Sequence, residues 1–591
     1  MADQGPLYLG FDLSTQQLKA IVVGSDLATA AQAKVDFDAD LGAKYGIHKG
    51  VHANAETGEV TAPVAMWLEA VDLVLSRLAS TSSQADGRAL MHRIRAIGGS
   101  GQQHGSIFWN DTAAQRLAGL DASTPLAEQL SPALALASSP NWQDQSTQRE
   151  CDAFDAALGG RQCLAHTTGS GAHHRFTGPQ IMRLRRTRPD VYARTARISL
   201  VSSWLASVLL GKLAPLDLAD VCGMNLWDVP QQQYSKPLLR LAAGDSDAQQ
   251  ENLRKLLGEP VLDAAAALGP VAPYFVSRYG FSPDCQVMPF TGDNPATILA
   301  LPLRPLDAIV SLGTSTTFLM NTPKYRPHGS YHFFNHPTTK GHYMFMLCYK
   351  NGGLAREKVR DALPPPAPGG TGWETFDQAV FDTPPLDLPP LELPSTCSND
   401  HANSRAKLGL YFPLRETVPN IRPGTWRFTC RPNGDDLGPA PSPWPPSTDA
   451  RVIVESQALS MRLRSQNLVH PPAADLPAQP RRIYLVGGAA RNPAIASVLG
   501  SVLGGADGVY KLDVGENACA LGGAFKALWA SERAQDQTFD DFVAERWKEE
   551  GSVQKVNQGF HPQTYARYQG VLGAFAAMEQ RLLAEEKHST Q

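Results

Sequence analysis

The sequence lacks several features that would place it in a specialised class. None of its eight Cys belongs to a CxxC pair, which favours reduced thiols in a cytosolic protein over a disulfide framework. It has no run of about 18 apolar residues, so a transmembrane helix is not expected. Its first residues, MADQGPLYLGFD, contain no basic segment followed by an apolar one, so a signal peptide is not expected. With a net charge of −4, neither nucleic acid nor a membrane surface is an expected partner.

Several nucleotide and metal motifs are missing as well. There is no GxxxxGK[ST], which excludes a P-loop kinase, and no HRD or DFG set, which excludes a protein kinase. The segment GGSGQQHG over 98–105 nearly matches GxGxxG, but its last Gly is one place late and no convincing acidic residue follows about 20 residues on. His328, His332, His336 and His342 have no Cys or carboxylate at ligand spacing, so no zinc site is expected.

What the sequence does contain centres on the stretch from Met288 to Met320. Gly292-Asp293-Asn294-Pro295 places a carboxylate in a tight turn, with a proline suited to the first turn of a helix. About 20 residues later, the apolar run 308–312 ends in Gly-Thr-Ser, a small-residue turn whose N–H groups and hydroxyls can surround an anion. A candidate base and a candidate phosphate loop are thus separated by about one helix. The alternative is a buried turn Asp followed by an ordinary hairpin.

A similar hairpin is predicted near the N-terminus. Strands at 7–11 and 18–23 flank Asp12-Leu-Ser-Thr-Gln-Gln17, a hydroxyl-rich turn that opens on a carboxylate. Asp12 at a strand end could hold Mg²⁺, which keeps most of its waters and needs few carboxylates. The alternative is a plain hairpin. Residues 307–320 repeat this strand–turn–strand pattern, which indicates a duplicated fold.

Three polar loops offer groups for a polyhydroxylated ligand. A strand at 93–97 leads to Gln102-Gln103-His104, which supplies hydrogen-bond donors and acceptors. Trp142 and Asp144 pair an aromatic face with a carboxylate, although a core Trp and a capping Asp are the alternative. Arg175 could hold a substrate oxygen in its guanidinium fork. The adjacent His173 and His174 cannot face one ligand from a regular strand, so we interpret them as surface residues or polar filler.

The remaining pattern alternates helices, strands and Pro-rich segments. Helices are predicted over 61–79 with Thr61 as N-cap, over 198–210 ending at Gly211, over 354–363 and over 452–468. Strands are predicted over 343–349 and 482–486. The latter leads to Gly487-Gly488-Ala489, where a ring or ribose could approach the backbone, or where the turn binds nothing. Residues 517–524 begin a small-residue helix able to pack closely on a neighbour. Residues 364–394, 432–446 and 471–480 are predicted to be loops or extended linkers, with Trp373 an exposed lid anchor or stacking face.

The order of these motifs resembles the FGGY carbohydrate kinases, and within that family it looks most like the branch that acts on xylulose in eukaryotes. The resemblance extends from about Leu7 to Trp529. The segments that carry it are GFDLSTQQLK (10–19), GSGQQHGS (99–106), HHRFTGPQI (173–181), RISLVSS (197–203), FTGDNPA (290–296), SLGTST (311–316), CYKNGG (348–353) and LVGGAARNP (485–493).

The resemblance implies a role for each candidate residue. It implies that D-xylulose is bound by His104, Arg175, Asp293 and Asn294, and that Asp293 is the catalytic base. The phosphates of ATP would lie against Ser14, Thr15, Gln16, Gly313, Thr314 and Ser315, and the adenine nucleoside against Trp373, Gly488, Ala489 and Asn492. Asp12 would organise Mg²⁺. Two departures stand out: Ser14 replaces the Gly of the usual Asp-x-Gly-Thr loop, and Ser170-Gly171-Ala172 replaces the usual Ser-Arg-Ala, which removes a cation.

The implied fold is α/β, with two ribonuclease-H-like domains of the actin and hexokinase type around a central cleft and Pro-rich insertions in the second. We expect a sugar-binding domain over 1–304, a nucleotide-binding domain over 305–535 and a helical tail over 536–591. The expected protein is cytoplasmic, a monomer or homodimer, and its domains close over the cleft to exclude water. It transfers the γ-phosphoryl group of ATP to O5 of D-xylulose, and the pKa of Asp293 need not rise much. A kinase of ribulose, glycerol or another polyol, and a non-enzymatic actin-like or sensor module, are the alternatives.

Overall fold

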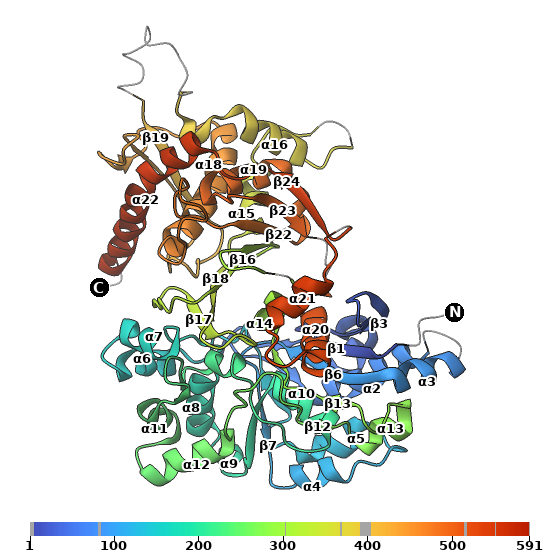
Figure 1. Ribbon diagram of the computed structural model, residues 1–591. Coiled ribbons are helices and arrows are strands. Elements are labelled where there is room, and N and C mark those ends of the chain that lie inside the picture. Colours follow the sequence, from blue (N-terminus) through green and yellow to red (C-terminus); the bar gives the residue numbers. More distant parts are fainter. Residues whose placement is uncertain are drawn as a thin grey trace. The chain divides into compact units, whose positions relative to one another are not determined.

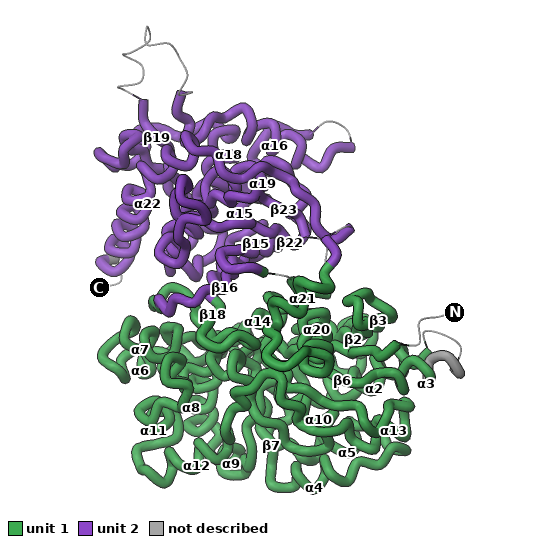
Figure 2. Tube along the Cα trace, in the orientation of Figure 1, with its two compact units in different colours: residues 1–303, 327–344, 516–547 green, residues 304–326, 345–515, 548–591 purple. Residues whose placement is uncertain are grey.

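The computed structural model describes residues 5–80, 84–301, 303–366, 369–389, 404–512, 517–549 and 551–589. The chain divides into two units, and each is assembled from separate stretches of sequence (Figure 2). Unit 1 comprises 1–303, 327–344 and 516–547, and unit 2 comprises 304–326, 345–515 and 548–591. Both units therefore contain residues from widely separated parts of the chain.

Unit 1 is built on a mixed sheet with the strand order β12-β13-β6-β1-β2-β3, in which β14 also pairs with β6. The predicted N-terminal hairpin is confirmed, because β1 (Leu7–Leu13) and β2 (Gln17–Gly24) are antiparallel. The predicted strand at 93–97 is longer than expected and forms β6 (Ile94–Gly101), which runs parallel to β1. The other strands of this sheet are β3 (Thr29–Asp36), β12 (Gly269–Pro270), β13 (Gln286–Val287) and β14 (Thr291–Gly292).

Helices α2 (Val64–Ala79), α10 (Val201–Leu210) and α20 (Ala518–Glu532) of unit 1 pack against the sheet (Figure 1). α2 and α10 belong to one large apolar core that also contains Leu9 and Phe11 of β1. The alternate residue Tyr8 belongs to a second core with α20, because successive strand residues point to opposite faces. The predicted Thr61 cap is wrong: Thr61 lies in β5 (Val60–Pro63), and Pro63 occupies the N-cap of α2.

α20 packs so closely on the sheet that its glycines are required. A Cβ on Gly10 of β1 would lie 1.9 Å from the carbonyl oxygen of Ala520, and one on Gly98 of β6 would lie 2.1 Å from that of Gly523. These distances leave no room for any side chain. The predicted close packing of the small-residue helix that begins near Asn517 is therefore confirmed.

The remaining elements of unit 1 surround this framework. They are η1 (Phe37–Leu41), α1 (Gly42–Tyr45), β4 (His52–Ala53), α3 (Gln84–Arg93), β7 (Ser106–Trp109), α4 (Ala113–Ala118), α5 (Leu126–Leu130), η2 (Ser131–Ala133), β8 (Ser138–Pro140), α6 (Gln148–Ala157), α7 (Arg161–Thr168), α8 (Thr177–Thr187), α9 (Pro189–Ala193), β9 (Arg197–Leu200), η3 (Asp220–Met224), β10 (Trp227–Asp228), β11 (Gln233–Tyr234), α11 (Lys236–Ala243), α12 (Asp247–Leu257), α13 (Pro273–Tyr279), α14 (Asp293–Leu299), β17 (His332–Asn335) and α21 (Phe539–Arg546).

Unit 2 repeats the local arrangement of unit 1, as the duplicated pattern predicts. β15 (Ala308–Leu312) and β16 (Thr316–Thr322) are antiparallel, and β15 runs parallel to β22 (Arg482–Val486), as β1 does to β6. The sheet continues in the order β18-β16-β15-β22-β23-β24. β18 (Tyr343–Tyr349) agrees with its predicted range. β23 (Gly508–Leu512) pairs with β24 (Val553–Asn557). The segment 536–591, which was expected to be helical, therefore also contains a strand.

The Pro-rich segments contain more regular structure than the sequence suggested. α16 (Trp373–Asp382) and η4 (Pro385–Asp387) lie inside the predicted linker 364–394, of which 367–368 and 390–394 lie outside the described residues. α18 (Pro446–Ser465) begins at the last residue of the second Pro-rich segment. The other elements of unit 2 are α15 (Gly353–Arg360), β19 (Ala406–Phe412), β20 (Gly424–Cys430), β21 (Gly438–Pro439), η6 (Gly488–Arg491), α19 (Pro493–Leu503) and α22 (Pro562–Ser589).

Candidate active site

Asp12 lies near the end of β1 and Asp293 directly follows β14, and these two strands flank the same central strand of unit 1, β6. Ser100 of β6 is the register partner of Asp12 in β1 on one side and of Thr291 in β14 on the other. All three strands are parallel, so their carboxyl ends meet at one edge of the sheet, where ligands of open α/β sheets bind. The turn after β6 brings Gln103 and His104 to the same edge.

Asp293 is the first residue of α14, and its neighbours hold it in place. Its Oδ1 accepts hydrogen bonds from the backbone N–H of Asn294 at 2.7 Å and from the Asn294 amide at 2.8 Å, and that amide also donates to Gln103 Oε1 at 2.9 Å. Burial raises the pKa of Asp293 to about 7, the negative charge of Asp12 adds to the rise, and the hydrogen bonds from Asn294 and Gln103 oppose it. The pKa is thus higher than the sequence led us to expect, and it suits a group that accepts a proton near neutral pH.

Asp12 is buried and has few partners. Ser100 Oγ donates to its Oδ1 at 3.2 Å, and the charge of Lys19, its register partner in β2, opposes the burial that raises the pKa of Asp12 to about 6. A buried carboxylate whose charged form is disfavoured would gain from a cation. Its donor set also fits Mg²⁺, which takes one or two carboxylates and keeps several waters. Among the described residues, no group of three or more His, Cys, Asp or Glu side chains is arranged to hold a metal ion.

His104 occupies a strained backbone position. Its φ is +74°, a backbone angle that residues other than Gly rarely adopt outside functional sites. Its Nδ1 lies 3.0 Å from the carbonyl oxygen of Gly223, which can only accept, so Nδ1 carries the proton and Nε2 presents a lone pair. The ring stacks on Phe176 with a centroid separation of 4.5 Å, and burial keeps the pKa of His104 well below its usual value. A neutral His104 can accept a hydrogen bond from a sugar hydroxyl.

Arg175 lies beside two histidines that the sequence analysis did not select. Its Nη2 donates to Nε2 of the buried His332 at 3.3 Å, and the ring of His173 lies 4.8 Å from that of His332. Both His173 and His174 are half-buried, which agrees with the alternative of polar filler, and His174 is hydrogen-bonded to Gln148. His332 is 157 residues from Arg175 in sequence, and no local pattern connects the two.

Trp142 and Asp144 have different surroundings. Trp142 is 40% exposed and donates from Nε1 to Thr15 Oγ1 at 2.8 Å, so it is not a core residue. Asp144 is buried, and both of its oxygens already accept hydrogen bonds, from the backbone of Val60 and Ser146 and from Gln180. The structure gives Asp144 a role in holding its loop, while its contact with a substrate stays a prediction.

Asp220 is a further acidic residue of this region, and the sequence analysis did not identify it. Its Oδ2 accepts from Ser202 Oγ at 2.5 Å, and burial raises its pKa to about 8, with the charges of Asp217 and Asp293 adding to the rise. Asp217 is balanced by the buried Lys526 of α20, whose Nζ lies 3.1 Å from Oδ2. Two buried carboxyls thus support the edge of the sheet that carries Asp293.

The turn Ser14-Thr15-Gln16 joins β1 to β2 next to Asp12. Ser14 closes it, since both its backbone N–H and its Oγ donate to the carbonyl of Gln17, at 2.9 and 3.0 Å. A Cβ on Gly50 would lie 2.0 Å from the carbonyl oxygen of Thr15, so Gly50 allows a second loop to support the turn. Gln16 is exposed, and Ser14 and Thr15 are partly exposed. The three residues are therefore accessible to a ligand.

In unit 2, the predicted phosphate loop follows β15. Gly313, Thr314 and Ser315 are exposed, and the start of α15 packs beneath them: the N–H groups of Gly353 and Leu354 donate to the carbonyls of Gly313 and Thr314. A Cβ on Gly352 would lie 2.4 Å from Thr316 Oγ1, so the glycine pair 352–353 permits this close approach.

A second loop of unit 2 lies at the same edge of its sheet, because β22 runs parallel to β15. Gly488 is exposed, and a Cβ added to it would meet nothing within 4 Å, which leaves space beside the backbone. Asn492 caps α19 by accepting from Ile495 N at 2.8 Å, and its amide donates to Asp377 of α16 at 2.6 Å. Trp373 is not in a loop as predicted. It begins α16, one turn before Asp377, which is the residue that contacts Asn492.

Comparisons with known proteins show the family of the chain. Residues 132–300 match the model of the N-terminal domain of the FGGY family of carbohydrate kinases, and residues 308–531 match that of the C-terminal domain. The chain is 54% identical to D-xylulose kinase A of Aspergillus niger, covering 99% of this chain and 100% of that protein. It is also 54% identical to a probable D-xylulose kinase A of Aspergillus clavatus, covering 99% of each.

Solved structures share the fold at low sequence identity. The xylulose kinase of Rhodospirillum rubrum superposes with a TM-score of 0.72 at 16% identity, covering 98% of this chain and 99% of that one. The xylulose kinase of Bifidobacterium adolescentis gives a TM-score of 0.68 at 20% identity, covering 96% and 99%. The expected two-domain kinase fold is thereby confirmed. The chain belongs to the FGGY family of carbohydrate kinases.

Proposed function

We propose that this protein is a D-xylulose kinase that transfers the γ-phosphoryl group of ATP to O5 of D-xylulose, giving D-xylulose 5-phosphate and ADP. The observation that carries the proposal is the 54% identity, over 99% of the chain, to proteins named D-xylulose kinase A. The edge of the unit 1 sheet supports it, because a carboxylate with a pKa of about 7 lies there beside polar groups suited to a sugar.

Asp293 is the proposed base. The two hydrogen bonds from Asn294 fix its Oδ1, so the carboxylate is oriented before the substrate arrives. It accepts the proton of the O5 hydroxyl as that oxygen bonds to phosphorus, which is general-base assistance of about 10²–10⁴-fold. His104 accepts a hydrogen bond from a sugar hydroxyl through Nε2, and Arg175 and Asn294 donate to sugar oxygens. Trp142 and Asp144 remain further candidates for the sugar side.

Unit 2 is the proposed nucleotide-binding unit. Gly313, Thr314 and Ser315 offer exposed N–H and hydroxyl groups to the phosphates, as do Ser14, Thr15 and Gln16 of unit 1. Trp373, Gly488, Ala489 and Asn492 are proposed to hold the adenine nucleoside. Asp12 is proposed to hold Mg²⁺ through its waters, and that ion when bound neutralises charge on the phosphoryl oxygens.

The proposed setting is the cytoplasm, with the protein acting as a monomer or homodimer. In the described part of the chain, no helix is both long and apolar enough to cross a membrane. We propose the sequence boundaries 1–304, 305–535 and 536–591 for the sugar-binding domain, the nucleotide-binding domain and the tail.

The test is sugar-dependent ADP release by the purified protein with Mg²⁺ and ATP. The panel contains D-xylulose, D-ribulose, L-ribulose, glycerol and D-xylitol. We expect the highest kcat/KM with D-xylulose. A higher value with another member would reassign the substrate within the family, and no sugar-dependent ADP release would favour a binding protein over an enzyme.

A further inference from the structure

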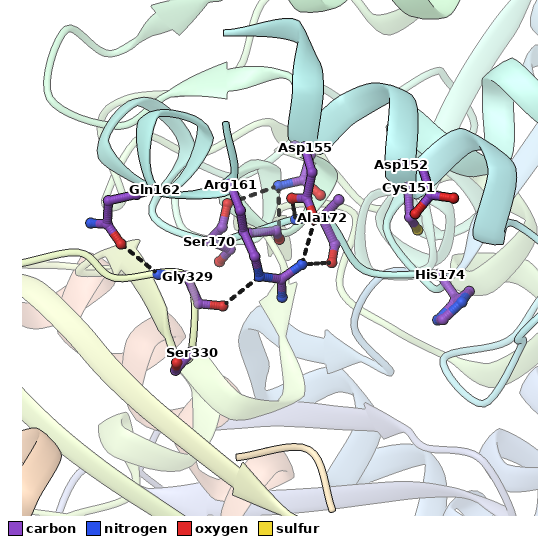
Figure 3. Close-up of polar contacts among 12 residues, drawn as sticks. Cys151, Asp152, Asp155, Arg161, Gln162, Ser170, Ala172, His174, Gly329 and Ser330 are labelled. Carbon is purple, nitrogen blue, oxygen red and sulfur yellow. Dashed lines mark hydrogen bonds and ion pairs between the residues drawn. The ribbon is translucent and has the colours of Figure 1, made fainter. Parts of the chain in front are cut away.

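Arg161, the first residue of α7, joins two segments that lie far apart in the sequence (Figure 3). Its Nε donates to the carbonyl of Gly329 at 3.0 Å, and its Nη1 donates to Asp155 at 2.7 Å and to the carbonyl of Ala172 at 3.2 Å. The next residue, Gln162, accepts from the N–H of Gly329 at 3.2 Å. The start of α7 therefore holds the segment 327–329 against the loop that leads to Arg175.

Two glycines create the space for the Arg161 side chain. A Cβ on Gly171 would lie 2.6 Å from both Cζ and Nε of Arg161, and one on Gly329 would lie 3.0 Å from its Cγ. Neither glycine has a positive φ, so the backbone at both positions accepts Ala. The atoms nearest to a methyl group at 171 all belong to the end of the flexible Arg161 side chain, so the substitution would displace the guanidinium without disturbing the fold.

The segment 327–329, which Arg161 holds, leads directly to His332. The backbone N–H of Phe333 donates to the carbonyl of Gly169 at 2.8 Å, which places His332 beside the loop 170–175. His332 Nδ1 lies 2.9 Å from Ser170 Oγ, and its Nε2 lies 3.3 Å from Arg175 Nη2.

The protonation of His332 follows from these partners. A guanidinium can only donate, so Nε2 must carry the lone pair, and Nδ1–H donates to Ser170. Burial and the positive charge of Arg175 favour this neutral form. His332 thus has one defined tautomer, and in that tautomer its Nε2 accepts a hydrogen bond from Nη2 of Arg175 and holds it in place.

We propose that Arg161 and His332 are positioning residues for Arg175. Arg161 docks the segment that carries His332, and His332 orients the guanidinium toward the sugar. The inference rests on the proposed function, in which Arg175 binds oxygens of the ketose. A guanidinium that is already held in one orientation loses less conformational entropy when it binds the sugar. Loss of the contacts that hold Arg175 should therefore weaken sugar binding and leave nucleotide binding unchanged.

The first experiment separates the two hydrogen bonds of His332. H332N retains an amide near the position of Nδ1 for Ser170 but has no atom at the position of Nε2. H332Q can place an amide oxygen near Nε2 to accept from Arg175. We expect H332N to raise the KM for D-xylulose by at least about tenfold and H332Q to restore most of that loss, with the KM for ATP within about twofold of wild type in both. Equal defects in the two variants, or a parallel rise in the KM for ATP, would overturn the proposal.

The second experiment is a double-mutant cycle on Arg161 and Gly171. We expect R161M and G171A each to raise the KM for D-xylulose by about fivefold or more, and the double variant R161M/G171A to be no worse than R161M, because the methyl group then meets no guanidinium. R77M is the matched control, since Arg77 also donates to a carboxylate, Asp40, and to a backbone carbonyl, that of Lys34.

The outcomes distinguish this inference from the proposed function. Additive defects in the cycle, or an unchanged sugar KM in R161M, would overturn the positioning role while wild-type activity stands. If wild type releases no ADP with any sugar of the panel, both the proposed function and this inference fail.

Discussion

Asp12 and Asp293 lie at one edge of a sheet, on either side of β6, and the negative charge of Asp12 adds to the burial that raises the pKa of Asp293. The relationship couples a candidate metal site to a candidate base. A cation held at Asp12 would offset that charge and lower the pKa of Asp293, so the base would be ionised when the phosphoryl group arrives with its metal.

The pKa of Asp293 predicts a pH-dependent cost to stability. A carboxyl whose folded pKa is about 7 binds a proton more tightly in the folded chain than in the unfolded one, where the ordinary value is 3.8. The free energy of unfolding therefore falls as pH rises from about 4 to about 7. D293N removes this loss, so we expect it to be more stable than wild type by about 1–3 kcal/mol at pH 8 and equal to wild type at pH 4, measured by urea unfolding without ligands.

The control for this prediction is D190N, because Asp190 is exposed and its ion pair with Arg194 lies on the surface. D190N should show no gain that depends on pH. A gain in D293N of the same size at both pH values would contradict the account of Asp293.

Substitution of Asp12 tests the proposed Mg²⁺ site. D12N keeps a hydrogen-bond acceptor for Ser100 Oγ and removes the charge. We expect the Mg²⁺ concentration for half-maximal ADP release to rise at least tenfold, and kcat to fall, with the KM for D-xylulose nearly unchanged. A magnesium titration at saturating ATP and sugar measures this. An unchanged magnesium requirement would show that Asp12 does not organise the metal.

Trp373 is expected to act on the nucleotide alone. W373A removes an aromatic face one helical turn from Asp377, the hydrogen-bond partner of Asn492, so the KM for ATP should rise about tenfold while the KM for D-xylulose stays within twofold. Trp426 is a matched control, because each Trp has an Arg near its ring and an edge-to-face Phe neighbour: Arg360 and Phe376 for Trp373, Arg422 and Phe412 for Trp426. An equal rise in W426A would indicate lost stability in unit 2 instead of a lost nucleotide contact.

Two Gly→Ala substitutions are expected to change stability in opposite directions, and the first of them tests the packing of α20 on the sheet. In G10A the new Cβ would lie 1.9 Å from a backbone oxygen that cannot move away easily, so we expect a loss of more than about 3 kcal/mol in the free energy of unfolding. In G573A, on helix α22, the methyl group meets nothing within 4 Å and should stabilise by about 0.5–1 kcal/mol. Differential scanning calorimetry compares the two. A near-neutral G10A would mean that the helix does not pack as closely as described.

Local patterns predicted the parts of the fold that depend on neighbouring residues. Short-range sequence rules predicted the hairpin around Asp12, the strand at 343–349 and the end of the helix at Gly211. Gly211 has a φ of +66°, as expected for a glycine that ends a helix. The same rules identified Asp293 and the turn after β15 as chemically distinctive.

Other elements were missed because their causes are not local. The prolines that flank Trp373 suggested an extended linker, yet Phe376 and Val380 are buried and hold α16 in place. β24 lies in a charged tail, and it forms a strand by pairing with β23, which is about 40 residues away in sequence. His332 gave no sign of its role, since its contact with Arg175 depends on Arg161 and on two glycines far apart in the chain.

The kinetics and sugar binding of D293N test the central claim most directly. Turnover is measured as ADP release at saturating D-xylulose and ATP, and the sugar Kd by titration calorimetry. We expect kcat to fall by at least about 10²-fold while the Kd for D-xylulose stays within a few-fold of wild type, because the amide keeps the shape of the side chain and loses only its ability to accept the proton. Near-normal turnover in D293N would contradict the assignment of Asp293 as the base.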